Sequence, residues 1–196
     1  MTERVIIRME RTIEKWYTQI YLKSIRKEFS YLGENCRIKH DTIFTNPRYI
    51  KIGDNFRADY RVKIDAWDKY EEQCFKPQII IGSNVSLNTD CYISAVHSIR
   101  IGDGVMMGRN VFISDHTHGE AKVHELSPAK RKLFSKGKVV VGNDVLIGSN
   151  VCIMPGVTIG DGCVIGANAV ITHSFGCNKC IAGIPARIIK ELDFQI

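Results

Sequence analysis

One period dominates the sequence: an aliphatic residue recurs every six positions along most of the chain. It runs through Val141, Ile147, Ile153, Ile159, Ile165 and Ile171, and also through Ile81, Leu87, Ile93 and Ile101, Met107, Ile113. Weaker runs join Leu32, Ile38, Phe44 and Ile52, Ala58, Ile64. A period of six matches neither the 3.6 residues of a helical turn nor the alternation of a strand. It predicts a triangular solenoid in which each six-residue unit, or hexad, forms one flat face and three hexads close a coil.

Glycines divide the hexads into groups of three and give a true repeat of 18 residues. A Gly follows the first aliphatic residue of every group, at positions 33, 53, 82, 102, 142 and 160, and never follows the third. Because Gly adopts backbone torsions that other residues avoid, we expect unusual torsions at this corner. A second apolar residue often recurs four positions after the aliphatic one, as at Val85 and Cys91, and should also point inward. The sequence therefore predicts about six coils around an apolar core.

Four interruptions of the period all fall after the third hexad of a coil. The aliphatic residue expected at position 70 appears at Ile81, and the one expected at 119 appears at Val141. Two shorter delays precede Ile52 and Ile101. All insertions therefore leave from one corner, and their loops should lie along one edge. Binding and catalytic residues are commonly placed on loops that a rigid scaffold positions, so we expect the functional site on this edge.

Composition excludes several classes of protein. The 196 residues carry 27 Lys and Arg against 21 Asp and Glu, and a net charge of +6 is too modest to indicate nucleic-acid binding. No apolar run approaches the roughly 20 residues that span a bilayer, so no integral membrane segment is expected. The N-terminus alternates charged and aliphatic residues, unlike a signal peptide. Seven cysteines without dense spacing fit a reducing compartment and predict a cytoplasmic protein.

We expect three parts in the chain. Residues 1–31 form an amphipathic, basic helical segment that packs on the first coil, with these side chains available for burial: Ile6, Ile13, Trp16, Ile20 and Leu22. Residues 32–184 form the solenoid, with a loop insertion at 114–140. Residues 185–196 form a short C-terminal helix, which Pro185 opens in a favourable first-turn position.

The segment GNDVLIGSNVCIMPGVTIGDGCVIGANAVIT, followed by AGIPARIIK, resembles the hexapeptide-repeat acyltransferases. Their fold is a left-handed parallel β-helix, an exception to the usual right-handed crossover that the period alone does not reveal. Within that family the chain is most similar to the galactoside, maltose and surface-polysaccharide O-acetyltransferases, over about residues 30–190. The resemblance implies acetyl-CoA as the donor, no required metal, a sugar or polysaccharide precursor as the acceptor, and a homotrimer with its sites between subunits.

The resemblance also implies a catalytic His at the root of the long insertion, where the chain reads Ser-Asp-His-Thr-His-Gly over 114–119. A hydroxyl needs a base to attack a thioester, and a neutral imidazole is suited to that proton transfer. The repeat puts Thr117 in the inward position, so neither His116 nor His118 belongs to the core. We expect His118 to be the general base, with His116 as the second candidate. Asp115 orients an imidazole, binds the sugar or caps the turn.

Six further positions match, by resemblance, residues that bind CoA: Ser149, Ala167, Thr172, His173, Arg187 and Lys190. The first two match small residues whose backbone contacts the pantetheine arm. The middle pair matches a Thr-Lys pair near the far end of CoA, with His in place of Lys. The last two, one turn apart on the expected terminal helix, match basic residues that meet its phosphates.

For the acceptor, Asn88 matches a sugar-binding Asn of the family. Asp65, Trp67 and Asp68 lie in the 65–80 insertion, where an aromatic ring and carboxylates could contact a sugar or could simply pack.

Three other functions remain open at this point. N-acetylation of an amino-sugar nucleotide would use the same base. A zinc protein like the γ-carbonic anhydrases would need three ligands among these imidazoles: His97, His116, His118 and His124. A non-catalytic solenoid would need no site at all. The single pair Cys177 and Cys180 lacks a second pair for a zinc site and favours buried thiols.

Overall fold

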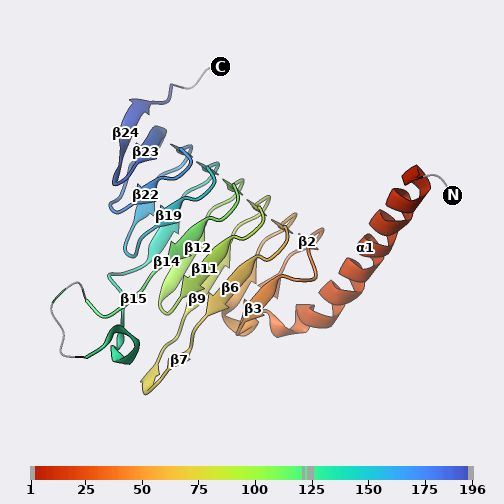
Figure 1. Cartoon of the computed structure of the whole chain (residues 1–196), viewed down its shortest axis with the longest axis horizontal. Helices are drawn as coiled ribbons and strands as arrows, with labels where there is room; N and C mark the ends of the chain where they lie inside the picture. Colours follow the sequence, from red (N-terminus) through yellow and green to blue (C-terminus); the bar gives the residue numbers. More distant parts are fainter. Residues whose placement is uncertain (1–2, 121, 123–125, 194–196) are drawn as a thin grey trace.

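The computed structural model describes residues 3–120, 122 and 126–193, and it is a three-sided parallel β-helix with one helix at its N-terminal end (Figure 1). Three sheets, called A, B and C, wind around one core in six coils. Sheet A contains β1 (Tyr31–Leu32), β4 (Ile50–Ile52), β9 (Gln78–Ile81), β12 (Ser98–Ile101), β17 (Val139–Val141) and β20 (Thr158–Ile159). Sheet B contains β2 (Arg37–Ile38), β5 (Arg57–Ala58), β10 (Ser86–Leu87), β13 (Met106–Met107), β18 (Leu146–Ile147), β21 (Val164–Ile165), β23 (Lys179–Gly183) and β24 (Ala186–Glu191). Sheet C contains β3 (Ile43–Thr45), β6 (Lys63–Ala66), β11 (Tyr92–Ala95), β14 (Phe112–Ser114), β19 (Cys152–Ile153) and β22 (Val170–Ile171).

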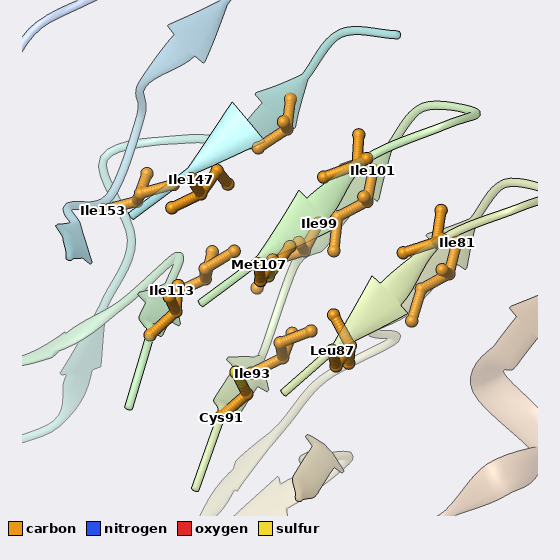
Figure 2. Close-up of a cluster of buried hydrophobic side chains, with 14 of the residues drawn as sticks. Ile81, Leu87, Cys91, Ile93, Ile99, Ile101, Met107, Ile113, Ile147 and Ile153 are labelled. Carbon is orange, nitrogen blue, oxygen red and sulfur yellow. The ribbon is translucent and has the colours of Figure 1, made fainter. Parts of the chain in front are cut away.

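The strand register confirms the hexads. Ile93 of β11 lies opposite Ile64 of β6 on one side and Ile113 of β14 on the other. Such side chains form one row per sheet along the stacking direction of the coils. The three rows meet in the middle of the solenoid (Figure 2). Val85 and Cys91, at the second inward position, are buried as well. Burial of this apolar stack supplies the main stabilisation, because each coil alone exposes its apolar surface on both open sides.

The repeated glycines serve close packing rather than unusual torsions, so that part of the prediction is wrong. The glycines with a positive φ are others, while Asn84, two residues after Gly82, adopts the left-handed conformation with φ 59°. A Cβ on Gly82 would lie 2.8 Å from the backbone N of Asp103 in the next coil. No real Cβ approaches a backbone atom so closely, and the corner between sheets A and B therefore needs Gly.

Both long insertions leave from the corner between sheets C and A, as the interrupted period predicts. The first forms a hairpin of β7 (Lys69–Tyr70) and β8 (Gln73–Cys74). The second forms a hairpin of β15 (Thr117–His118) and β16 (Leu133–Phe134) and contains the 3₁₀ helix η3 (Pro128–Lys130). Figure 1 shows both projecting on the same side of the stack. Another 3₁₀ helix, η2 (Pro47–Tyr49), occupies the shorter insertion before β4.

The N-terminal helix α1 (Glu3–Ile25) confirms the expected helical segment, and η1 (Arg26–Glu28) joins it to the first coil. Leu22 is buried, and the Tyr21 hydroxyl donates to the backbone carbonyl of Thr42 at 3.2 Å. The expected burial of the remaining apolar residues is wrong within this chain, because three are exposed: Ile13, Trp16 and Ile20. The side chain of Ile6 lies outside the described part. No described helix combines the length and apolar character needed to cross a membrane.

The expected C-terminal helix over 185–196 is wrong: residues 186–191 form strand β24, which pairs antiparallel with β23. The last coil leaves an open sheet edge, and a strand that returns through the turn at Gly183 satisfies the backbone groups of that edge. Ile188 and Ile189 are β-branched and favour the extended conformation. Residues 194–196 lie outside the described part.

Ile93→Ala tests the aliphatic stack. Ile93 has 0% of its surface exposed and lies between Ile64 and Ile113, so the variant leaves a cavity that the stacked coils cannot fill. We expect the free energy of unfolding to fall by about 2–5 kcal/mol in denaturant titrations. Ile43→Ala is the matched control, since Ile43 is 55% exposed, and should cost less than about 1 kcal/mol. Equal losses in the two variants would contradict the stacking argument.

Candidate active site

Most of the predicted site residues lie on two edges of the solenoid. The corner between sheets B and C, here the B–C edge, carries Asn88 after β10, Ser149 after β18 and Ala167 after β21. The corner between sheets C and A, here the C–A edge, carries 115–118 after β14 and 172–173 after β22. The two edges lie at opposite ends of the strands of sheet C. One chain therefore does not bring all the predicted residues together.

Asp115 anchors the root of the long insertion. Its carboxylate is fully buried and accepts three backbone N–H groups, from Val96 at 3.0 Å, His97 at 2.9 Å and Ser98 at 2.7 Å. The repeat predicts Thr117 as the inward residue, but Asp115 takes the buried place and Thr117 is only half-buried. The side chain of Asp115 has no surface to offer a sugar. Asp115 therefore caps the backbone N–H groups of residues 96–98 and fixes its own corner against the corner of the preceding coil.

The two histidines after Asp115 have different surroundings. Nδ1 of His116 lies 2.9 Å from Asp115 Oδ1 and 3.3 Å from the Ser114 hydroxyl, and only 11% of this side chain is exposed. His118 is exposed, and its Nδ1 lies 3.4 Å from the Tyr70 hydroxyl. The rings of His118 and Tyr70 meet edge to face with centroids 5.4 Å apart. His118 is therefore an exposed imidazole with Nδ1 beside a hydroxyl, whereas the ring of His116 is mostly buried and lies against the Asp115 carboxyl group.

The β7–β8 hairpin supports the long insertion, a contact that sequence reasoning missed. The Tyr70 hydroxyl donates to the Ala129 carbonyl at 3.1 Å. Gln73 donates its side-chain amide to the Leu133 carbonyl at 3.1 Å, and its Oε1 accepts the Leu133 N–H at 2.6 Å. These bonds join insertions about 60 residues apart in the chain. The shared edge was the available signal, since it requires the two loops to be neighbours.

Asp65 and Asp68 of the first insertion have structural partners. Asp65 is fully buried and accepts the hydroxyls of Thr45 at 2.6 Å and Tyr92 at 3.0 Å, with Lys63 Nζ at 3.1 Å. The hydrogen bond to Asp65 raises the pKa of Lys63. Asp68 pairs with Arg48 and Trp67 is half-buried. The structure thus favours packing over sugar contact at Asp65.

The B–C edge is narrow where the predicted donor residues lie. A Cβ on Gly108 would lie 2.6 Å from the backbone N of Ser149, and one on Gly148 would lie 2.5 Å from that of Ala167. Ser149 Oγ accepts the Arg109 N–H at 3.2 Å. A thin ligand arm can therefore run along this edge with little side-chain bulk in its way.

The remaining donor residues lie on the C–A edge and on the terminal hairpin. Thr172 and His173 are exposed neighbours, with Thr172 Oγ1 3.3 Å from His173 Nδ1. The His173 ring packs on Phe175 at a centroid distance of 4.5 Å. Arg187 and Lys190 are exposed on strand β24, opposite Ala182 and Cys180. Their expected spacing of one helical turn is therefore replaced by the extended spacing of a strand.

A groove of about 870 Å³ adjoins Asn88 on the outer face of sheet B. Helix α1 forms one wall through Thr18 and Gln19. The sheet contributes the following residues: Arg37, Ile38, Lys39, Arg57, Ala58, Asp59, Ser86, Leu87, Asn88, Met106 and Met107. Sequence reasoning assigned a binding role to Asn88 alone among them, because no motif links four successive coils to the helix.

Within the described residues, no three His, Cys, Asp or Glu side chains gather in a group that could hold a metal ion. The sequence favours buried thiols for the Cys177 and Cys180 pair, but Cys177 is exposed and Cys180 half-buried. Burial raises the pKa of the thiols of Cys91 and Cys163. Those two thiols are therefore mostly protonated and poor nucleophiles.

Comparisons with known proteins place this architecture. The family model "Bacterial transferase hexapeptide (six repeats)" matches residues 138–173. A protein of Escherichia coli strain K12 whose assigned role is lipopolysaccharide biosynthesis O-acetyl transfer, WbbJ, is 34% identical over 168 residues, which cover 82% of each chain.

Two solved structures extend the comparison. A galactoside acetyltransferase in complex with coenzyme A is 30% identical, with a TM-score of 0.57 over 86% of this chain and 68% of that one. AntD, an N-acyltransferase from Bacillus cereus, has a TM-score of 0.72 at 23% identity and 91% coverage of both chains, which shows the fold alone. The predicted fold class, a left-handed parallel β-helix, is confirmed.

Asp115→Asn tests the anchor of the long insertion. The amide retains one oxygen acceptor, so at least one of the three backbone N–H groups loses its partner in a buried place. We expect the free energy of unfolding to fall by about 1–3 kcal/mol and amide exchange to accelerate at 96–98. Asp103→Asn is the control, since that carboxylate is exposed and accepts Ser83 N–H at the surface. If the exchange rates at 96–98 stay unchanged, the anchoring role is wrong.

Proposed function

Because the chain belongs to the hexapeptide-repeat acyltransferases, we propose that it is an acetyl-CoA-dependent O-acetyltransferase of a sugar or a surface-polysaccharide precursor. O-acetyl transfer in lipopolysaccharide biosynthesis is the role assigned to its 34% identical relative. Coenzyme A is the ligand of the 30% identical galactoside acetyltransferase. The observation that carries the proposal is the exposed imidazole of His118 at the root of the long insertion.

His118 is the proposed general base. With Nδ1 beside the Tyr70 hydroxyl, Nε2 is free to accept the proton of an acceptor hydroxyl. The hydroxyl oxygen forms a bond to the thioester carbonyl carbon, and the C–S bond then breaks. The leaving thiolate takes the proton back from the imidazolium, so the products are the acetyl ester and free CoA. His118 ends each cycle neutral, as it began.

Asp115 and His116 are proposed as positioning residues. The carboxylate binds the backbone of the preceding corner and orients the His116 ring, and both residues precede His118 within one short turn. Because the anchor is buried and fully hydrogen-bonded, it fixes where β15 begins. The position of His118 therefore follows from a contact in the scaffold rather than from the exposed loop.

A second copy of the chain is proposed to complete the site. The donor residues Ser149 and Ala167 and the acceptor residue Asn88 lie on the B–C edge, whereas His118 lies on the C–A edge. A cyclic trimer sets the B–C edge of one copy against the C–A edge of the next, because its interfaces join two different patches. Thr172 and His173 then join the donor site from the C–A edge. Arg187 and Lys190 are proposed to meet the phosphates of CoA from strand β24. The proposed location is the cytoplasm, where reduced cysteines persist.

His118→Ala tests the base. We expect kcat for acetyl transfer to fall by about 10²–10⁴-fold, since proton removal loses its acceptor, while CoA affinity is unchanged. His116→Asn is the comparison: its amide can still donate to Asp115, and kcat should stay within about tenfold. Cys74 and Cys177 are exposed and would react with thiol reagents, so CoA is measured by chromatography.

The acceptor screen for this test contains neutral sugars, amino sugars and sugar phosphates. The reverse pattern, with His116→Asn inactive and His118→Ala active, assigns the base to His116. Transfer to the amine alone would contradict O-acetylation in favour of N-acetylation. Absence of transfer and of CoA binding with every acceptor would reject the acyltransferase mechanism proposed for these residues.

Mixed assemblies test the shared site. His118→Ala and Asn88→Ala chains are each expected to be inactive alone. When the two are denatured, mixed and refolded together, an interface with both intact side chains forms where an Asn88→Ala copy supplies His118 to a His118→Ala copy. Random mixing should restore about a quarter of the wild-type rate per site. If the refolded mixture forms trimers like those of the wild type but recovers no activity, the proposal that two copies share one site is wrong.

A further inference from the structure

The groove beside Asn88 contains two guanidinium groups in the same row of sheet B. Arg37 of β2 and Arg57 of β5 are register partners, so their side chains leave neighbouring strands on the same outer face. Both residues are exposed. Among the residues that the structure describes, neither has an ion-pair or hydrogen-bond partner for its side chain. Like charges directly opposite each other destabilise a pair of strands, so this pair has an electrostatic cost.

Three other arginines of the chain have carboxylate partners. Arg26 pairs with Glu34 at 2.9 Å, Arg48 with Asp68 and Arg61 with Asp90 at 2.6 Å. The groove also holds Asp59, but its Oδ1 accepts the N–H of Tyr60. Lys39 adds a third positive charge to the lining and lies over the Tyr60 ring. The lining therefore carries three cationic side chains against one carboxylate, within a hollow large enough for a ligand.

We propose that this groove binds a phosphoryl group carried by the acceptor, so that the acceptor is a phosphorylated saccharide. The inference rests on the proposed function for the role of Asn88, which lines the same groove. A phosphate or diphosphate group offers at least three acceptor oxygens and about two or more negative charges. It can therefore bind both guanidinium groups at once. A carboxylate offers two oxygens and one charge, which a single Arg satisfies. Two adjacent Arg side chains thus favour a phosphoryl group over a carboxylate.

The groove also has room for the part of the ligand that follows the phosphate. Met106 of β13 is 57% exposed on the same outer face of sheet B. Thr18 and Gln19 of α1 form the opposite wall. Ser86, in register with Arg57, and Asn88 at the corner provide polar contacts toward the B–C edge. A ligand held by its phosphate at Arg37 and Arg57 therefore points its sugar toward Asn88. That edge is where a neighbouring copy would present His118.

Binding of inorganic pyrophosphate tests the groove without any need for turnover. Isothermal titration is done on the wild type and on the double variant Arg37→Gln, Arg57→Gln, with CoA present at saturation so that phosphate-binding residues of the donor site are occupied. We expect the double variant to bind pyrophosphate at least about tenfold more weakly, because two charge-assisted contacts are lost. Arg100→Gln is the matched control, since Arg100 is exposed on the outer face of sheet A, and should leave affinity unchanged.

Acetyl transfer gives the second readout. The acceptors are a neutral sugar, the matching uronate, sugar 1-phosphate, nucleoside-diphosphate sugar and prenyl-diphosphate sugar, and the last three identify the source of the phosphoryl group. In the double variant we expect KM to rise at least about tenfold for the phosphorylated acceptor the wild type prefers, while kcat and the KM for acetyl-CoA stay unchanged. Conservative Arg37→Lys, Arg57→Lys should retain part of the affinity.

The outcomes separate the two proposals. Pyrophosphate affinity that is equal in the wild type and the double variant would overturn the groove assignment, as would a preference for the neutral sugar or the uronate. Pyrophosphate binding that depends on Arg37 and Arg57, without acetyl transfer to any acceptor, would leave the groove standing and contradict the proposed function. Thermal unfolding of the double variant should match that of the wild type or exceed it, because removal of like charges relieves repulsion.

Discussion

The close vertical stacking of the coils is the constraint on which the rest of the structure depends. Adjacent coils approach so closely at the corner between sheets A and B that a Cβ on Gly102 would lie 2.6 Å from the Gly142 carbonyl oxygen. That corner cannot take an insertion without separating the aliphatic layers. The corner between sheets C and A has no such glycine after its aliphatic residue, and every insertion leaves from it. The packing of the core thus decides where loops, and with them a site, can be built.

Where an insertion interrupts the parallel strands, backbone N–H groups lose their usual partners. Buried polar side chains occupy these places on the C–A edge. Asp65, Ser94, Ser114 and Asp115 are all buried there. Asp115 takes three N–H groups of the preceding corner, and this fixes the first residues of the long insertion. The β7–β8 hairpin then supports the same insertion through Tyr70 and Gln73. The exposed imidazole of His118, in β15 at the start of this insertion, is therefore held by the scaffold.

Sequence reasoning succeeds where one periodic force decides the outcome. The rows of aliphatic residues, the six coils and the edge of the insertions follow from the repeat alone, because burial repeats with the chain. It fails where a distant partner decides. The C-terminal residues PARIIKEL have helical character in isolation but pair with the open edge of the last coil as β24. The contact between Tyr70 and His118 joins two insertions, and the buried place of Asp115 belongs to a broken repeat, so neither has a periodic signal.

The division of the proposed site between two edges bears on how the enzyme would recognise its acceptor. A solenoid face is flat, so a single chain offers depth only where a loop or helix stands over it, as α1 does beside sheet B. The cationic groove and Asn88 belong to the first coils of that face, whereas His118 lies in β15 on the C–A edge. Under the proposed assembly, one copy would hold the charged end of the acceptor and the next copy would supply the base. Binding energy gained at Arg37 and Arg57 would then be used to place a hydroxyl at a base carried by another chain, so that assembly itself sets the reacting geometry.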